Sequence, residues 1–155
     1  MATGCKLPGG ASVAAPDLRL DELRECIGTP WKHQGRNPKV GLDCAGFGAH
    51  WLALNGITVK DRADYGRDPD GSLWEEITRC LGEPIAHGRG CAAKCQPGDV
   101  VLVQYTPNVP RHVGVIADAY GLSLIHADSR ERKVVEHPLD ARWAKRLVAV
   151  WRLPA

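Results

Sequence analysis

Five short alternating runs after Pro97 constrain the fold of this chain more than any other feature. They are rich in β-branched residues, turn residues separate them, and they span 98–105, 112–118, 122–128, 133–139 and 147–153. A period of two is expected of strands that bury one face and leave the other polar. The runs therefore predict an antiparallel sheet, connected as a meander.

Three earlier segments have helical spacing of their apolar residues instead. They cover 17–28, 43–56 and 72–82, and each ends at a glycine. Asp43 and Ser72 stand where the second and third helices begin, the place where a short polar side chain caps free N–H groups. Helices followed by a sheet indicate an α+β domain, with the N-terminal helices packed on one face of a five- to six-stranded antiparallel sheet.

Length and composition fit one globular domain. The chain has 155 residues, of which 44% are hydrophobic and 25% charged, in the ordinary range for a domain with a single core. Residues 1–15 are mostly glycine, alanine and small polar residues without a hydrophobic period. We therefore expect a loose N-terminal arm over 1–15 and a single domain over 16–155.

Charge and hydropathy argue against nucleic-acid or membrane partners. Twenty basic and eighteen acidic side chains give a net charge of +2, too small to indicate nucleic-acid binding. No apolar run approaches the ~20 residues that span a bilayer, and the first residues lack a signal-peptide pattern. We expect a protein that is cytoplasmic as made, whose six cysteines are mostly free thiols.

Cys44 is the cysteine best placed for catalysis. It follows Asp43 in the first turn of the second expected helix, where free N–H groups and the helix dipole stabilise a thiolate. The same N–H groups can receive the oxyanion that develops when an amide carbonyl is attacked. A buried structural thiol is the alternative, so the catalytic hypothesis needs a base.

Two of the six histidines can supply that base. His112 begins one alternating run, His126 ends the next, and the turn at 118–121 joins the two runs. A hairpin about this turn sets the two histidines almost opposite each other on one face, with Cβ atoms ~5 Å apart. One imidazole can then accept a hydrogen bond from the other. A one-residue slip in register would send them to opposite faces.

Five motifs, in order, resemble those of the NlpC-like cysteine peptidases. They are GTPWKHQG (28–35), GLDCAGF (41–47), PGDVVL (97–102), RHVGV (111–115) and IHA (125–127). The resemblance covers about residues 18–153. It implies a papain-like fold, in which the nucleophile lies at a helix N-terminus packed against an antiparallel sheet.

The resemblance also implies roles and a reaction. Cys44 would be the nucleophile, His112 the general base and His126 the polar residue that orients the base. The implied enzyme is a cysteine endopeptidase that cuts an amide in the stem peptide of peptidoglycan, typically between γ-D-glutamyl and diaminopimelate. It would need no metal and no cofactor.

The residues expected at the substrate are Trp31, Asp43, Ala45 and Arg111. Family members that bind a free peptide N-terminus usually carry Ser at the position of Ala45 and Tyr at that of Trp31. The resemblance therefore does not extend to recognition of a free L-Ala amine. Trp31 is expected to wall the cleft, with simple core packing as its alternative.

Within the family, the short chain and its variant motifs look most like the phage or prophage tail-assembly branch. That resemblance implies tail-tip proteins as further partners. It also implies a virion tail as an alternative location to the cytoplasm.

Three other functions stay open at this point. The chain could be a structural tail component that makes little use of catalysis. Four soft ligands within sixteen positions, Cys80, His87, Cys91 and Cys95, would suit a zinc-binding module. A papain-like amidase or acyltransferase on another substrate is the third, because fold and triad do not fix the acyl donor.

Overall fold

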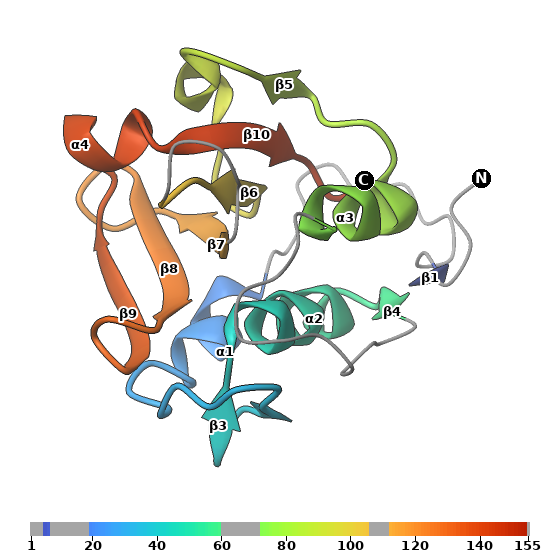
Figure 1. Cartoon of the computed structure of the whole chain (residues 1–155), viewed down its shortest axis with the longest axis vertical. Helices are drawn as coiled ribbons and strands as arrows, with labels where there is room; N and C mark the ends of the chain where they lie inside the picture. The colour runs from blue at the N-terminus through green and yellow to red at the C-terminus, as the bar shows by residue number, and fades with distance from the viewer. Residues whose placement is uncertain (1–4, 7–18, 60–71, 106–111, 155) are drawn as a thin grey trace.

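A six-stranded antiparallel sheet forms the centre of the protein (Figure 1). The computed structural model describes residues 5–6, 19–59, 72–105 and 112–154. In spatial order the strands are β5 (Ala86–His87), β10 (Leu147–Trp151), β6 (Val100–Val103), β7 (His112–Ala117), β8 (Ser123–Asp128) and β9 (Lys133–Pro138).

The predicted meander is right for β6 to β9 and wrong for β10. The last strand does not continue beside β9 but returns to pair with β6, from Leu147↔Val103 to Trp151↔Val100. A further edge strand, β5, pairs with β10 and was not predicted, because two residues are too short to show alternation. Alternation identifies strand residues but does not choose their partners.

Helices and small strand pairs surround the sheet. The helices are α1 (Leu20–Arg24), α2 (Cys44–Leu54), α3 (Leu73–Leu81) and α4 (Ala141–Ala144), with a 3₁₀ helix at Cys91–Lys94. Two short antiparallel pairs join β1 (Cys5–Lys6) to β4 (Thr58–Val59) and β2 (Arg36–Asn37) to β3 (Gly41–Leu42). The first helix is shorter than the segment 17–28 that the spacing predicts. The side chain of Ser72 makes no capping hydrogen bond to α3.

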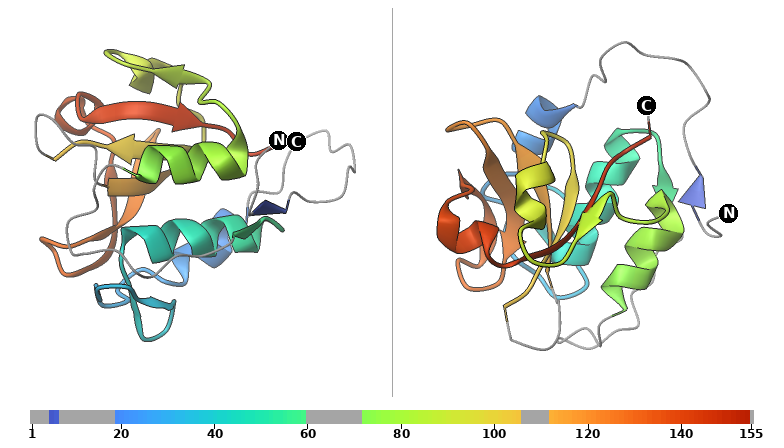
Figure 2. Two further views of the ribbon diagram at one scale, coloured as in Figure 1. Left: turned by 45° about the vertical axis from the view of Figure 1, so that its right-hand side comes forward. Right: turned by 90° about the horizontal axis from the view of Figure 1, so that it is seen from above.

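The predicted packing of the N-terminal helices against the sheet is confirmed. Figure 2 shows α2 lying along the sheet, close to β7. Phe47 and Trp51 of α2 are fully buried in a core that they share with apolar residues of α1, α3 and the sheet. The indole N–H of Trp51 donates to the carbonyl of Gly98 at 3.1 Å, so its burial leaves no donor unpaired.

A second, smaller core covers the opposite face of the sheet. Val101, Ile116, Leu124 and Val150 are fully buried there, together with Trp143 of α4. This layer was not predicted from the sequence, because α4 is only four residues long and too short to show a helical period. The sheet is therefore covered on both faces, and the strand residues of both parities are buried.

The N-terminal arm is described only at Cys5–Lys6, where it pairs with β4. The rest of 1–15 lies outside the described residues. Across the described part of the chain, no helix is long and apolar enough to cross a membrane.

Four of the cysteines follow the expectation of mostly free thiols. Cys26, Cys44, Cys91 and Cys95 are free, whereas Cys80 is disulfide-bonded. A bonded sulfur cannot serve as a thiolate ligand. Within the described ranges, no group of three or more His, Cys, Asp or Glu residues is arranged to hold a metal ion. The set of four zinc ligands considered above therefore loses Cys80.

The close packing of α2 against the segment at Gly35 depends on a glycine. A Cβ on Gly46 would lie 1.9 Å from the carbonyl oxygen of Gly35, so only a residue without a side chain fits. Two residues further along the helix, a Cβ on Gly48 would meet only a side-chain methyl of Val113, at 3.2 Å.

Substitution of these two glycines gives a matched test of how closely α2 packs. We expect Gly46→Ala to lower the free energy of unfolding by about 3 kcal/mol, because backbone atoms must move. Gly48→Ala gains about 1 kcal/mol of helix propensity against a mild contact, so it should stay within about 1 kcal/mol of wild type. Urea unfolding measures both, and equal losses for the two variants would refute the close contact.

Candidate active site

Asp43 caps α2 and fixes Cys44 at the first helical position. Its Oδ1 accepts hydrogen bonds from the Gly46 N–H at 2.8 Å and the Arg36 guanidinium at 3.0 Å. Its Oδ2 accepts from the Gln34 N–H at 2.9 Å. Both oxygens of this buried carboxylate thus bind protein donors. The structure gives Asp43 a capping role, and its contact with substrate stays a prediction.

The thiol of Cys44 lies at the N-terminal end of β7. Burial raises the pKa of this thiol, and hydrogen bonds from the backbone N–H groups of Val113, Ala45 and Cys44 itself offset only part of that rise. Val113 follows His112 directly in the chain. The structure therefore brings the predicted nucleophile beside the strand end that carries the predicted base.

His112 and His126 are hydrogen-bonded to each other. Nε2 of His112 lies 2.6 Å from Nδ1 of His126, and the rings are nearly perpendicular, at 80°. Both residues are buried. The register Val115↔Ile125, continued by one step, sets Gly114 opposite His126. The two histidines share a face, as the sequence predicts, but lie diagonally rather than directly opposed.

A third histidine continues this contact. Nε2 of His126 lies 2.8 Å from Nε2 of His137 on β9, and Nδ1 of His137 lies 3.0 Å from the carbonyl oxygen of Pro138. Sequence reasoning missed His137. The signal was present, because β9 is the next alternating run and its register His126↔Val135 puts position 137 on the same face as His126.

Aromatic rings enclose the three histidines. The ring of Tyr105 lies 5.0 Å from that of His112, and Trp143 lies 5.1 Å from His126 and 4.6 Å from His137 between ring centroids. The Arg130 guanidinium sits over Tyr105, 4.6 Å from its centroid. These residues were also missed. Their packing restrains the imidazoles and helps to bury His112 and His126.

Burial keeps the Cys44 thiol and the His112 imidazole neutral. It raises the pKa of the Cys44 thiol to about 11. Burial, with the nearby charge of Arg130, lowers the pKa of His112 to about 3. The pKa of His126 is also lowered, first by burial and then by His112. The sequence predicted a stabilised thiolate, but here desolvation outweighs the N–H groups at the helix start.

The structure describes two of the three other residues that were predicted to contact substrate. Trp31 is half-buried, donates its backbone N–H to the Arg132 carbonyl at 2.9 Å and packs partly on the main core. Ala45 is half-buried beside Cys44. Arg111 lies outside the described residues. Their contact with substrate stays a prediction.

A cysteine at a helix start, packed against an antiparallel sheet that carries paired histidines, is the arrangement of a papain-like fold. The family model of the NlpC/P60 family matches residues 28–152. The chain belongs to the NlpC/P60 family, a family of cell-wall peptidases.

Solved structures agree on the fold. An NLP/P60 family protein from Staphylococcus aureus is 18% identical, with a TM-score of 0.60 over 89% of this chain and 41% of that one. An NlpC/P60 family protein from Bacillus cereus is 22% identical, with a TM-score of 0.62 over 92% and 42%. The NlpC/p60 domain of the peptidoglycan hydrolase SagA is 20% identical, with a TM-score of 0.56 over 88% and 97%.

The chain thus spans about two fifths of the length of the Staphylococcus and Bacillus proteins but nearly all of the SagA domain. No protein of curated function matches the sequence.

The neutral pair predicts how Cys44 alkylation depends on pH. Since the thiol has a raised pKa and His112 a lowered one, the thiolate forms only as the pH rises toward about 11. We expect the rate of iodoacetamide labelling at Cys44 to climb about tenfold per pH unit from pH 6 to 9. Peptide mass spectrometry measures it, with glutathione in the same tube as the reference thiol. A rate that is already level at pH 6 would instead indicate a thiolate–imidazolium pair.

Proposed function

We propose that the protein is a cysteine endopeptidase that hydrolyses an amide bond in the stem peptide of peptidoglycan. Cys44 is the nucleophile, His112 the general base and His126 the residue that orients it. The observation that carries this proposal is the 2.6 Å contact between His112 and His126 at the strand end where the Cys44 thiol lies. Family membership supports the substrate class.

The first half of the reaction, which forms the thioester, starts from a neutral Cys44 thiol and a neutral His112. As Sγ of Cys44 attacks the carbonyl carbon, its proton passes to His112, so no free thiolate has to exist beforehand. The Cys44 backbone N–H at the start of α2 donates to the developing oxyanion. His112 then gives the proton to the amine as the C–N bond breaks, which leaves a thioester on Cys44.

Water completes the cycle. His112 takes a proton from the attacking water, the thioester opens, and the proton returns to the sulfur as the carboxylic acid leaves. His126 holds the His112 ring in place through both halves. None of these steps needs a metal or an organic cofactor.

The finer specificity rests on the motif resemblance. We propose the γ-D-glutamyl–diaminopimelate bond as the scissile bond. Trp31 and Ala45 stand where relatives that bind a free peptide N-terminus carry Tyr and Ser, so we expect no requirement for a free N-terminal amine. The tail-assembly motifs support a place in a phage or prophage tail, or in the cytoplasm before assembly, with tail-tip proteins as partners.

Digestion of purified peptidoglycan tests the activity. We expect wild type to release fragments with a new amine and a new carboxylate, and Cys44→Ala and His112→Ala to lose about 10³-fold or more of the rate. Mass spectrometry of the products names the bond. Stem peptides with a free and a blocked N-terminus, compared in the same assay, test the role of Trp31 and Ala45.

Cys91→Ala is the matched control, because Cys91 is a buried free thiol packed in the other core. It should keep the wild-type rate. Fragments that persist in Cys44→Ala would refute the nucleophile. If wild type leaves every substrate intact, a structural role in tail assembly becomes the better account.

A further inference from the structure

We propose that His137 is a positioning residue of the active site. It is the last of three hydrogen-bonded histidines, and it decides which ring nitrogen of each carries the hydrogen. Nδ1 of His112 is thereby left unprotonated and can accept the proton of the Cys44 thiol. The proposal rests on the function proposed above. The geometry consists of three contacts in series, from His112 to His126 at 2.6 Å, to His137 at 2.8 Å and to the Pro138 carbonyl at 3.0 Å.

The Pro138 carbonyl sets the order of the protons. A carbonyl oxygen only accepts, so Nδ1 of His137 must carry a hydrogen. Nε2 of a neutral His137 is then bare, and it accepts the hydrogen on Nε2 of His126. Nδ1 of His126 is bare in turn and accepts from Nε2 of His112.

The last atom of this series is Nδ1 of His112, the ring nitrogen that does not contact His126. With its hydrogen on Nε2, a neutral His112 has an unprotonated Nδ1, which is the form that can take the Cys44 proton. The reverse order would point a bare Nδ1 of His137 at the lone pairs of the Pro138 oxygen. It would also put a hydrogen on Nδ1 of His112, where no base is then left.

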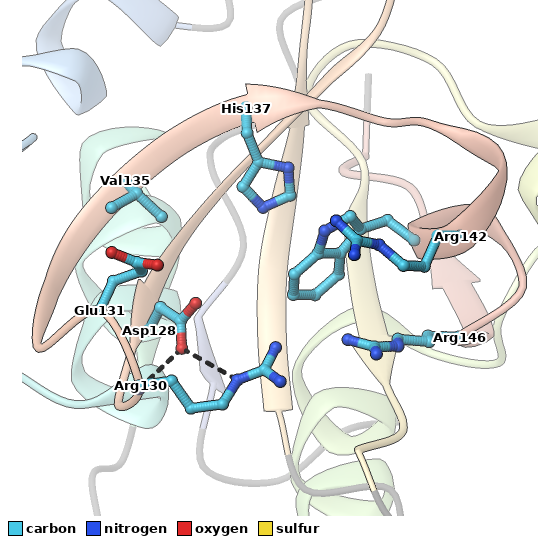
Figure 3. Close-up of a pocket in the computed structure, with 8 residues that line it drawn as sticks. Asp128, Arg130, Glu131, Val135, His137, Arg142 and Arg146 are labelled. Carbon is cyan, nitrogen blue, oxygen red and sulfur yellow. Dashed lines mark hydrogen bonds and ion pairs between the residues drawn. The ribbon is translucent and has the colours of Figure 1, made fainter.

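The residues around His137 restrain the three histidines but do not replace the hydrogen bonds between them. His137 is half-buried and lines a cavity of about 490 Å³, with Arg142 and Arg146 on one side and Asp128, Arg130 and Glu131 on the other (Figure 3). Its ring lies 4.6 Å from that of Trp143. Asp128 and Arg130 face each other at 3.9 Å. Among the residues that the structure describes, Nε2 of His126 forms its hydrogen bond with His137.

Two substitutions separate the hydrogen bond from the bulk of the side chain. In His137→Gln the amide oxygen can still accept from Nε2 of His126. In His137→Leu no acceptor remains, and His126 is free to move its hydrogen to Nδ1. The control is His87→Leu, which removes an exposed histidine on the edge strand β5 whose ring contact is with Trp74.

Nitrogen-15 NMR of histidine-labelled protein at pH 8 reads the tautomers directly. We expect hydrogen on Nε2 of His112 and His126 and on Nδ1 of His137 in wild type. His137→Gln should keep this pattern at the first two, and His137→Leu should shift His126 toward the Nδ1–H form. This readout needs no activity, so it tests the chain even if the peptidase function proves wrong.

Kinetics on the peptidoglycan substrate supply the second readout. Loss of a partner that orients a metal-ligating histidine typically costs 10- to 100-fold in activity. We expect the same order here, with kcat of His137→Leu falling about 10- to 100-fold and KM within about twofold. His137→Gln should recover to within about threefold of wild type, and His87→Leu should not change. Thermal unfolding checks that each variant folds, and His137→Ala replaces the leucine variant if that one does not.

Three results would overturn the proposal. One is an unchanged His126 tautomer in His137→Leu. Another is a kcat for that variant equal to wild type, and the third is a loss in His137→Gln as large as that in His137→Leu.

Discussion

The close seating of α2 on the sheet is the contact on which the rest of this structure depends. Gly46 touches the Gly35 carbonyl with no room for a Cβ, and Phe47 and Trp51 fill the core beneath the helix. The same seat brings the helix start to the N-terminal end of β7, where the Val113 N–H reaches the Cys44 thiol. One packing arrangement therefore builds the core and assembles the candidate site, because Gly46 and Phe47 lie two and three residues after Cys44.

Burial then decides the chemistry of the site. A helix N-terminus in water favours a thiolate, but here Cys44 is half-buried and His112 buried, and desolvation moves their pKa values apart in the direction that keeps both neutral. A neutral pair stores no charge in the resting enzyme. In the reaction proposed above, charge separates only during attack, when the N–H groups at the helix start and the oriented imidazole stabilise it.

The enclosure extends beyond the two histidines that sequence reasoning selected. Tyr105, His137 and Trp143 come from three different segments: Tyr105 lies against His112, and His137 and Trp143 lie against His126. Arg24 anchors β9 nearby, with its Nε and Nη2 each 3.0 Å from Glu136, the residue before His137. The edge strand that carries His137 is therefore tied to α1 as well as to β8, which restrains the end of the histidine chain.

The sequence by itself determined the α+β class, the strands β6 to β9, the helix that begins at Cys44 and the pairing of His112 with His126. These follow from local periodicity, from turns and from a hairpin between neighbouring strands. Only the tertiary structure decided that β10 returns to β6, that α4 covers the second face, that Cys80 is bonded and that His137 reaches His126. The reason is that alternation records which face a side chain takes, whereas strand partners, register and burial depend on contacts between residues far apart in the chain.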